Sequence, residues 1–216
     1  MARMVFEKTG DSVWISHLDL MRVFQRAFRR AGLLLKHSQG FTPRAIVSIA
    51  LPLSVGMESH CELLDFELED GTVPTVEQIN EKLPAGIRAL SISDGGRKLK
   101  ELTHLQAKLK LQYDGGVPTD APEGILALFA RDELILEKHS RKGDTQTNIL
   151  PLLTKLELSQ PDEKTLELNV LVCAQNPALN PLLLITAIER YAPRWTPNGT
   201  SCTRIEIFDA EGTVFR

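Results

Sequence analysis

The segment with the clearest pattern covers residues 15–32, which read ISHLDLMRVFQRAFRRAG. Its apolar residues recur at helical spacing and predict one buried face, formed by Leu20, Phe24, Ala27, Phe28 and Ala31. Ser16 is a typical N-cap, and Asp19 follows three residues later, as in a capping box. Gly32 is a typical residue just after the end of a helix. The segment therefore predicts an amphipathic helix from about Ser16 to Ala31.

The segments around this helix predict a βαββαβ order. A second capping box, Thr75 with Gln78, opens a short helix. Four strands are expected, at residues 3–8, 46–51, 61–69 and 87–92. This order is the split βαβ pattern of a ferredoxin-like fold.

The same order recurs after the polar stretch 93–101, which we interpret as a linker. Pro122 and Pro181 each suit the start of a helix. Strands are expected at residues 105–113, 134–138, 166–172 and 204–208, with a partly helical insertion at 144–156. We therefore predict an α+β fold of two tandem ferredoxin-like (βαββαβ) units, with domains at residues 1–96 and 97–216.

Composition and cysteine spacing narrow the class of protein. The chain is 43% hydrophobic and 25% charged, as in ordinary globular proteins, and no apolar run reaches the roughly 18 residues that cross a bilayer. Residues 1–10, MARMVFEKTG, contain no signal-peptide core, so we expect a cytoplasmic protein without a membrane partner. Cys61, Cys173 and Cys202 stand alone, so we expect no metal site and no cofactor.

Charge is distributed unevenly along the chain. Residues 1–50 hold eight Lys and Arg against three Asp and Glu, a net of +5, whereas residues 51–96 hold two against nine, a net of −7. A basic segment beside an acidic one suggests a polar binding face. The sequence pI of about 6.0 argues against broad coating of nucleic acid.

Three arginines form the basic side of the first helix. Arg22, Arg26 and Arg29 lie opposite its apolar face, and Arg30 flanks them. Arginine binds phosphate bidentately, so this row is a candidate RNA-binding surface. A solvated, charged helix face is the ordinary explanation of such a row, and both interpretations stay open.

Two further features are candidate binding elements. His17 lies in the first turn of the helix, where it suits an anion ligand, a general base or a half-buried structural residue. The long connection 33–45 carries Ser38, Gly40, Phe41 and Arg44 at its centre. Phe41 is expected either to stack on an RNA base or to anchor the connection on the core, and Gly40 to supply an unusual backbone angle. We hypothesise that His17, Arg22 and part of residues 38–44 share one pocket.

The remaining motifs are weak. The basic turn at residues 138–144 is either a phosphate contact or a solvated hairpin tip. The sequence contains no G-x-G-x-x-G, Walker loop, H-E-x-x-H or nucleophile elbow. We therefore assign no catalytic residue and expect a binding protein more than an enzyme.

Two groups of motifs resemble a known family. They are Ile15 to Arg22 with the following arginines, and Ser38-Gln39-Gly40-Phe41-Thr42-Pro43 with Leu53-Ser54-Val55-Gly56-Met57-Glu58-Ser59. They resemble the radical-SAM-linked family of unknown function, found as a tail on, or a companion to, B12-binding radical SAM proteins. The resemblance implies a radical SAM partner and an RNA setting. The cluster of that chemistry needs three closely spaced cysteines, which would belong to the partner.

Three functions therefore remain open. The first is a non-catalytic module that presents RNA or another macromolecular substrate to a radical SAM enzyme. The second is a metal-independent RNA endoribonuclease of the CRISPR repeat-processing type, by analogy of tandem ferredoxin-like halves alone. The third is a structural partner subunit.

Overall fold

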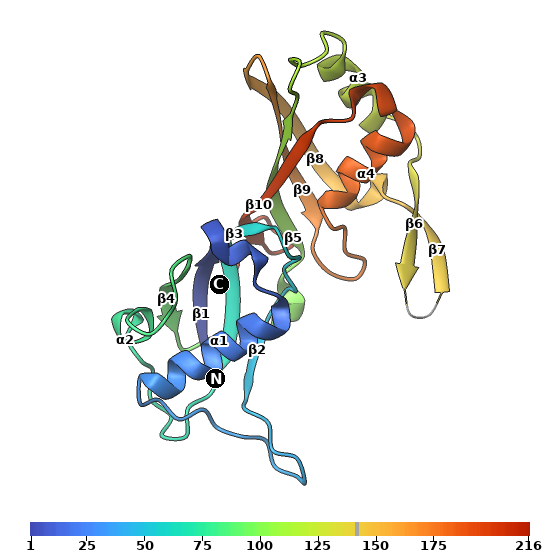
Figure 1. Cartoon of the computed structure of the whole chain (residues 1–216). Helices are drawn as coiled ribbons and strands as arrows, with labels where there is room; N and C mark the ends of the chain where they lie inside the picture. Colours follow the sequence, from blue (N-terminus) through green and yellow to red (C-terminus); the bar gives the residue numbers. More distant parts are fainter. Residues whose placement is uncertain (141–142) are drawn as a thin grey trace. The chain divides into compact units, whose positions relative to one another are not determined.

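The computed structural model describes residues 1–140 and 143–216, without the side chains of residues 138–145. The chain forms two compact units, one of Met1–Glu101 with Val214–Arg216 and the other of Leu102–Thr213. Both combine antiparallel strands with helices (Figure 1), which confirms the predicted α+β class. Within the described residues, no helix has both the length and the apolar character that a membrane span requires.

The first unit has one sheet and two α-helices. Its strands lie in the order β4-β1-β3-β2, and every neighbouring pair is antiparallel. Its elements, in chain order, are β1 (Ala2–Lys8), η1 (Gly10–Trp14), α1 (His17–Arg30), β2 (Val47–Ile49), β3 (Glu58–Phe66), α2 (Val76–Asn80), β4 (Ile87–Ser93) and η2 (Leu99–Glu101).

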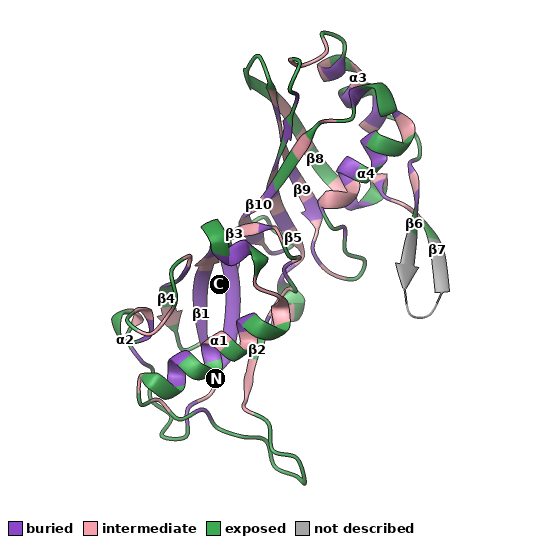
Figure 2. Cartoon of the chain, viewed as in Figure 1, coloured by how far each residue is buried: buried purple, intermediate pink, exposed green. Residues whose placement is uncertain are grey.

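Helix α1 packs its apolar face on this sheet. Phe24 contacts Phe6 of β1, and Phe28 contacts Phe66 of β3, each with ring centroids 4.7 Å apart. Such pairs stabilise by about 0.5–1.5 kcal/mol beyond their buried area. The buried residues of α1 include four of the five predicted, Leu20, Phe24, Ala27 and Phe28. This packing turns the opposite side of α1 outward, as the exposed stripe in Figure 2 shows.

The ends of α1 also follow from the sequence. The Ser16 hydroxyl accepts a hydrogen bond from the Asp19 backbone N–H at 3.2 Å and so caps the first turn. At the other end Gly32 has φ +74°, the left-handed conformation that glycine adopts without strain. The helix is therefore fixed in register as well as in orientation.

The second unit also has one main sheet and two α-helices. Its strands lie in the order β10-β5-β9-β8, again antiparallel throughout. Its elements are β5 (His104–Gln112), α3 (Ala121–Phe129), β6 (Ile135–Ser140), β7 (Gly143–Asn148), η3 (Leu150–Leu152), β8 (Leu153–Asp162), β9 (Thr165–Cys173), α4 (Leu182–Tyr191), η4 (Pro193–Trp195) and β10 (Gly199–Phe208).

The middle of this unit differs from the prediction. The strand expected at 134–138 is β6, which pairs with β7 in a separate hairpin and not with the main sheet. The insertion expected at 144–156 contains β7, the short η3 and the start of β8, and β8 is the strand that pairs with β9. Neither segment shows a strict apolar–polar alternation, since residues 134–136 are all apolar and residues 149–153 are apolar in a row, so the local pattern does not reveal which of them joins the main sheet.

Candidate nucleic-acid interface

The outer side of α1 presents the predicted arginine row to solvent. Arg22 pairs with Asp19 at 2.8 Å, and both side chains are more than half exposed, at 65% and 57%. Such exposed pairs contribute little and exchange readily for other partners. In the part of the chain that the structure describes, the exposed Arg26 and Arg29 form no hydrogen bond or ion pair. Two guanidinium groups are therefore free to bind an anion, and a third is weakly held.

The centre of the 33–45 connection is a closed turn. The Ser38 N–H donates to the Arg44 carbonyl at 2.8 Å, and the Arg44 N–H donates to the Ser38 hydroxyl at 3.1 Å. His37 and Ala45 form a β-bridge directly below this closure. Gly40 has φ +134°, which confirms the unusual backbone angle expected there.

Phe41 projects from the tip of this turn. Its relative exposure is 111%, so the interpretation that it anchors the connection on the core is wrong. The physical reason is the closure by Ser38 and Arg44, which fixes the turn through its own backbone and leaves the ring unused. Figure 1 shows the connection extending away from the sheet of the first unit. An exposed aromatic on a fastened turn is able to stack on a base.

A cavity of about 350 Å³ lies next to α1, below the closed turn. It lies where the C-terminal end of α1 meets the base of the connection, and its walls are Gln25, Arg29, Leu33, Leu34, Leu35, His37, Ala45 and Glu69. Leucine side chains supply an apolar wall, and the rim is polar. The structure therefore brings Arg29 together with the connection, as one surface.

His17 is not part of this grouping. It starts α1, whereas Arg29 ends it, and a rise of 1.5 Å per residue separates the two ends by about 20 Å. His17 is half-buried, and its Nδ1 atom has no hydrogen-bond partner among the described residues. Hydrogen bonds from the Ser16 hydroxyl and then from Arg22 hold the pKa of Asp19 below its usual value, so a carboxylate already occupies the first turn. Neither His17 nor Arg22 lines the cavity, and the pocket that His17, Arg22 and residues 38–44 would share stays a prediction.

Two residues of the interface were missed in the sequence. Gln25 lies four positions before Arg29 and therefore on the same face of α1. This spacing was available in the sequence, but the prediction considered only the arginines. His37 directly precedes the turn, but only the closed backbone places it beside α1.

The other candidates give no further site. Arg141 and Lys142, at the centre of the basic turn at 138–144, lie outside the described residues. Elsewhere in the described chain, no three His, Cys, Asp or Glu side chains gather as metal ligands would. The interface combines cations, an aromatic ring and a cavity, groups that are able to bind an anion and to stack on a base.

These features define a class of protein: an α+β chain of two compact units with a basic helix face and an exposed aromatic turn in the same unit. The chain belongs to a family described as uncharacterized protein conserved in bacteria (DUF2344), which it matches over residues 2–181. Among curated proteins, none matches this sequence.

One solved structure shares the fold at low identity. A chain in the crystal structure of a Cbf5-Nop10-Gar1 complex superimposes with a TM-score of 0.52 at 11% identity, over 97% of this chain and 50% of that chain. A chain of the archaeal box H/ACA sRNP Nop10-Cbf5 complex gives a TM-score of 0.43 at 12% identity, over 94% and 46%, which is too low to carry an argument. The present chain thus spans about half the length of these chains. The first likeness shows the fold alone.

Proposed function

We propose that this chain is a non-catalytic RNA-binding module, built from two ferredoxin-like units, that presents RNA to a radical SAM partner enzyme. The observations that carry the RNA part are the exposed arginine row of α1, the exposed Phe41 ring and the cavity where α1 meets the base of the 33–45 connection. Single-stranded RNA is bound by this combination of cations for phosphate and aromatic rings for bases.

The fold supports this proposal through its strand orders. The orders β4-β1-β3-β2 and β10-β5-β9-β8 are equivalent, position by position, once the β6–β7 hairpin is set aside. Both correspond to a βαββαβ unit whose sheet has one face covered by helices. In the first unit, that arrangement presents the outer side of α1 to solvent.

The partner part of the proposal rests on the family resemblance at residues 15–31 and 38–59. The cysteines Cys61, Cys173 and Cys202 lie apart in the sequence, so a radical SAM cluster would belong to the partner. Co-purification of the two proteins, with and without RNA, tests this part separately from RNA binding.

The RNA part is tested by the salt dependence of binding. We expect the triple variant Arg22→Ala, Arg26→Ala, Arg29→Ala to bind a single-stranded oligonucleotide more weakly. The slope of log K against log salt should fall by about 2, since each lost phosphate contact on a single strand removes roughly 0.7. Fluorescence anisotropy between 50 and 300 mM salt, roughly the range where such slopes are resolved, measures both quantities.

A matched control removes the same charge elsewhere. Arg88, Arg131 and Lys164 are exposed and lie outside α1, so their triple alanine variant should keep the wild-type slope. An unchanged slope in the α1 variant would show that the arginine row is only a solvated helix face. Metal-independent cleavage of the oligonucleotide that is lost in His17→Ala would instead favour the endoribonuclease.

A further inference from the structure

The main sheet of the second unit has a face that its helices leave open. Helices α3 and α4 lie on one side of this sheet (Figure 1). Along β5, Leu105, Ala107 and Leu109 are buried, and His104 and Gln106 alternate with them and so lie on the opposite face. Antiparallel sheets commonly pack one face on a core and leave the other for solvent or ligand. Yet His104 and Gln106 are half-buried, so this face is hollowed.

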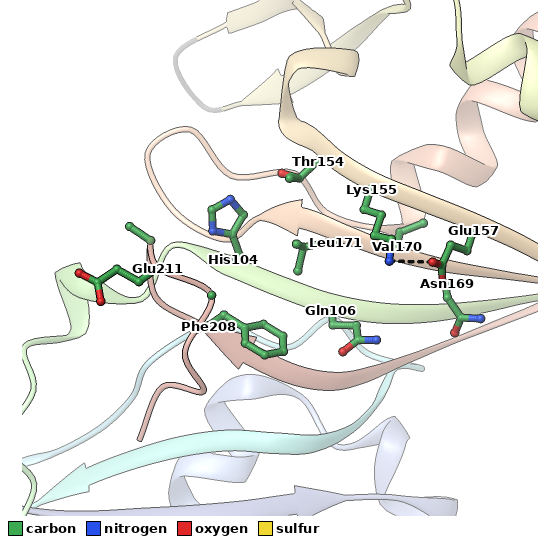
Figure 3. Close-up of a pocket in the computed structure, with 12 residues that line it drawn as sticks. His104, Gln106, Thr154, Lys155, Glu157, Asn169, Val170, Leu171, Phe208 and Glu211 are labelled. Atoms are coloured by element: carbon green, nitrogen blue, oxygen red, sulfur yellow. Dashed lines mark ion pairs between the residues drawn. The ribbon is translucent and has the colours of Figure 1, made fainter.

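The hollow is a cavity of about 480 Å³ (Figure 3), within the range of roughly 300–1,000 Å³ that small-molecule sites occupy. Strands β5, β8, β9 and β10 form its floor, and the turn after β10 forms one wall. The Asp209 carboxylate stabilises that turn by accepting hydrogen bonds from the backbone N–H groups of Glu211 and Thr213, each at 2.9 Å. The cavity is therefore built from fixed elements.

An aromatic ring lies at one end of the cavity. Phe208 of β10 is directly opposite His104 of β5, so the two side chains rise from the same face. His104 is held by the Thr103 hydroxyl, 2.9 Å from its Nδ1 atom. Both rings are half-buried, which leaves part of each available to a planar ligand.

Two side-chain amides follow the ring in a row (Figure 3). Gln106 lies opposite Leu171, so Asn169 of β9 is its diagonal neighbour, at about 7–8 Å. Neither amide forms a hydrogen bond in the described part of the chain, although both are half-buried. Each offers a donor beside an acceptor, the pattern by which Asn and Gln bind adenine through two hydrogen bonds.

The charges of the cavity disfavour phosphate. Lys155 is paired with Glu157 at 2.7 Å, and Glu211 adds a second carboxylate. The lining therefore carries a net negative charge when His104 is neutral. An uncharged heterocycle fits this balance, whereas a phosphate would be repelled.

We propose that this cavity binds an adenine base, which stacks on Phe208 and forms hydrogen bonds with Gln106 and Asn169. The base belongs either to a free adenosine or to an unstacked nucleotide of single-stranded RNA, whose phosphates would remain outside the cavity. The site lies in the second unit and uses no residue of the α1 interface. It therefore stands whether or not the proposed function holds.

Titration followed by NMR tests the proposal directly. We expect adenosine to shift the side-chain amide resonances of Gln106 and Asn169, and AMP to bind no more tightly than adenosine. Hexa-adenylate is the second ligand of the titration. If the oligonucleotide binds, the base in the cavity comes from RNA; if only adenosine binds, the ligand is a free nucleoside. The triple α1 arginine variant should bind adenosine as the wild type does, which separates this site from the proposed function.

Variants locate the contacts. Phe208→Leu should weaken adenosine binding roughly 5- to 150-fold through lost stacking, and Gln106→Leu or Asn169→Leu about 3- to 10-fold. Gln112→Leu, on the same face of β5 but outside the cavity, should have no effect. Gln106→Glu keeps the size of the side chain and tests the lost donor if the leucine variant does not fold.

Two results would overturn the proposal. One is the absence of any shift of these amides with adenosine and with hexa-adenylate at millimolar concentration. The other is adenosine binding that survives in Phe208→Leu, Gln106→Glu and Asn169→Leu together.

Discussion

Two buried residues with polar groups, Lys8 and Tyr113, each stabilise one unit through hydrogen bonds to backbone carbonyls. The Lys8 ammonium group is fully buried and donates to the carbonyls of Val13 and Ile15, at 3.0 and 2.9 Å. These carbonyls directly precede the N-cap of α1, so Lys8 helps to set where the arginine row begins. Burial lowers the pKa of Lys8, a cost that the two hydrogen bonds offset. In the second unit, the Tyr113 hydroxyl donates to the Trp195 carbonyl at 2.8 Å.

Tyr113 predicts a specific loss of stability at alkaline pH. Burial raises the pKa of Tyr113 to about 12, from 10.0. A raised pKa means that the neutral phenol stabilises the folded state fully below pH 10, and that this contribution is lost as pH rises toward 12. By pH 11 the loss amounts to about 1 kcal/mol.

Urea unfolding between pH 8 and 11, as a rough working range, measures this effect. Tyr113→Phe should be about 1 kcal/mol less stable at pH 8, because the Trp195 carbonyl loses its donor, but its stability should fall less steeply with pH. Burial also raises the pKa of Cys202 to about 12, which adds a second loss of stability at alkaline pH. Cys202 is present in both proteins, so this contribution cancels when the stability of the variant is subtracted from that of the wild type. Equal slopes in wild type and variant would contradict the assignment to Tyr113.

At the scale of elements, α3 is shaped by one glycine. Gly124 lies beneath the Trp195 ring, and a Cβ atom there would lie 1.8 Å from the ring edge. Trp195 is itself fixed, since its Nε1 donates to Asp120 at 3.2 Å and the Arg194 guanidinium lies 4.4 Å from its ring centroid. The glycine therefore sets how closely α3 approaches η4.

Gly124→Ala reverses the usual effect of alanine in a helix. Alanine ordinarily stabilises a helix by about 0.5–1 kcal/mol over glycine, but the clash with Trp195 should cost about 1–3 kcal/mol. Urea unfolding followed by Trp195 fluorescence, in a Trp14→Phe background, measures the sum. Gly115→Ala, which meets nothing within 4 Å, serves as the control. A stabilised Gly124→Ala variant would show that the ring moves freely.

Elements were predictable from the sequence where local chemistry specifies them. The Ser16 and Thr75 caps and the apolar stripe of α1 all reappear in the structure. Strand pairing was harder to predict, because neither β6 nor the segment that contains β8 has a local pattern that decides which of them pairs with β9. The exposure of Phe41 likewise depends on the backbone closure between Ser38 and Arg44, which no residue type signals by itself.

At the scale of the whole molecule, the two units carry different chemistry on the same strand order. The first presents the exposed arginines of α1 and the exposed Phe41 ring, and the second presents uncharged amides and Phe208 on its open sheet face. The C-terminal Phe215 returns to the first unit, where the guanidinium groups of Arg3 and Arg97 lie 5.3 and 4.7 Å from its ring centroid. The chain thus begins and ends in the unit that we assign to RNA.

Crosslinking tests that assignment most directly. Ultraviolet irradiation of the protein with single-stranded RNA, followed by mass spectrometry, identifies the residues that touch bases. The account predicts crosslinks within residues 33–45, centred on Phe41, that disappear in Phe41→Ala while the melting temperature is unchanged, since the ring makes no core contact. Crosslinks that avoid residues 33–45, or that persist unchanged in Phe41→Ala, would contradict it.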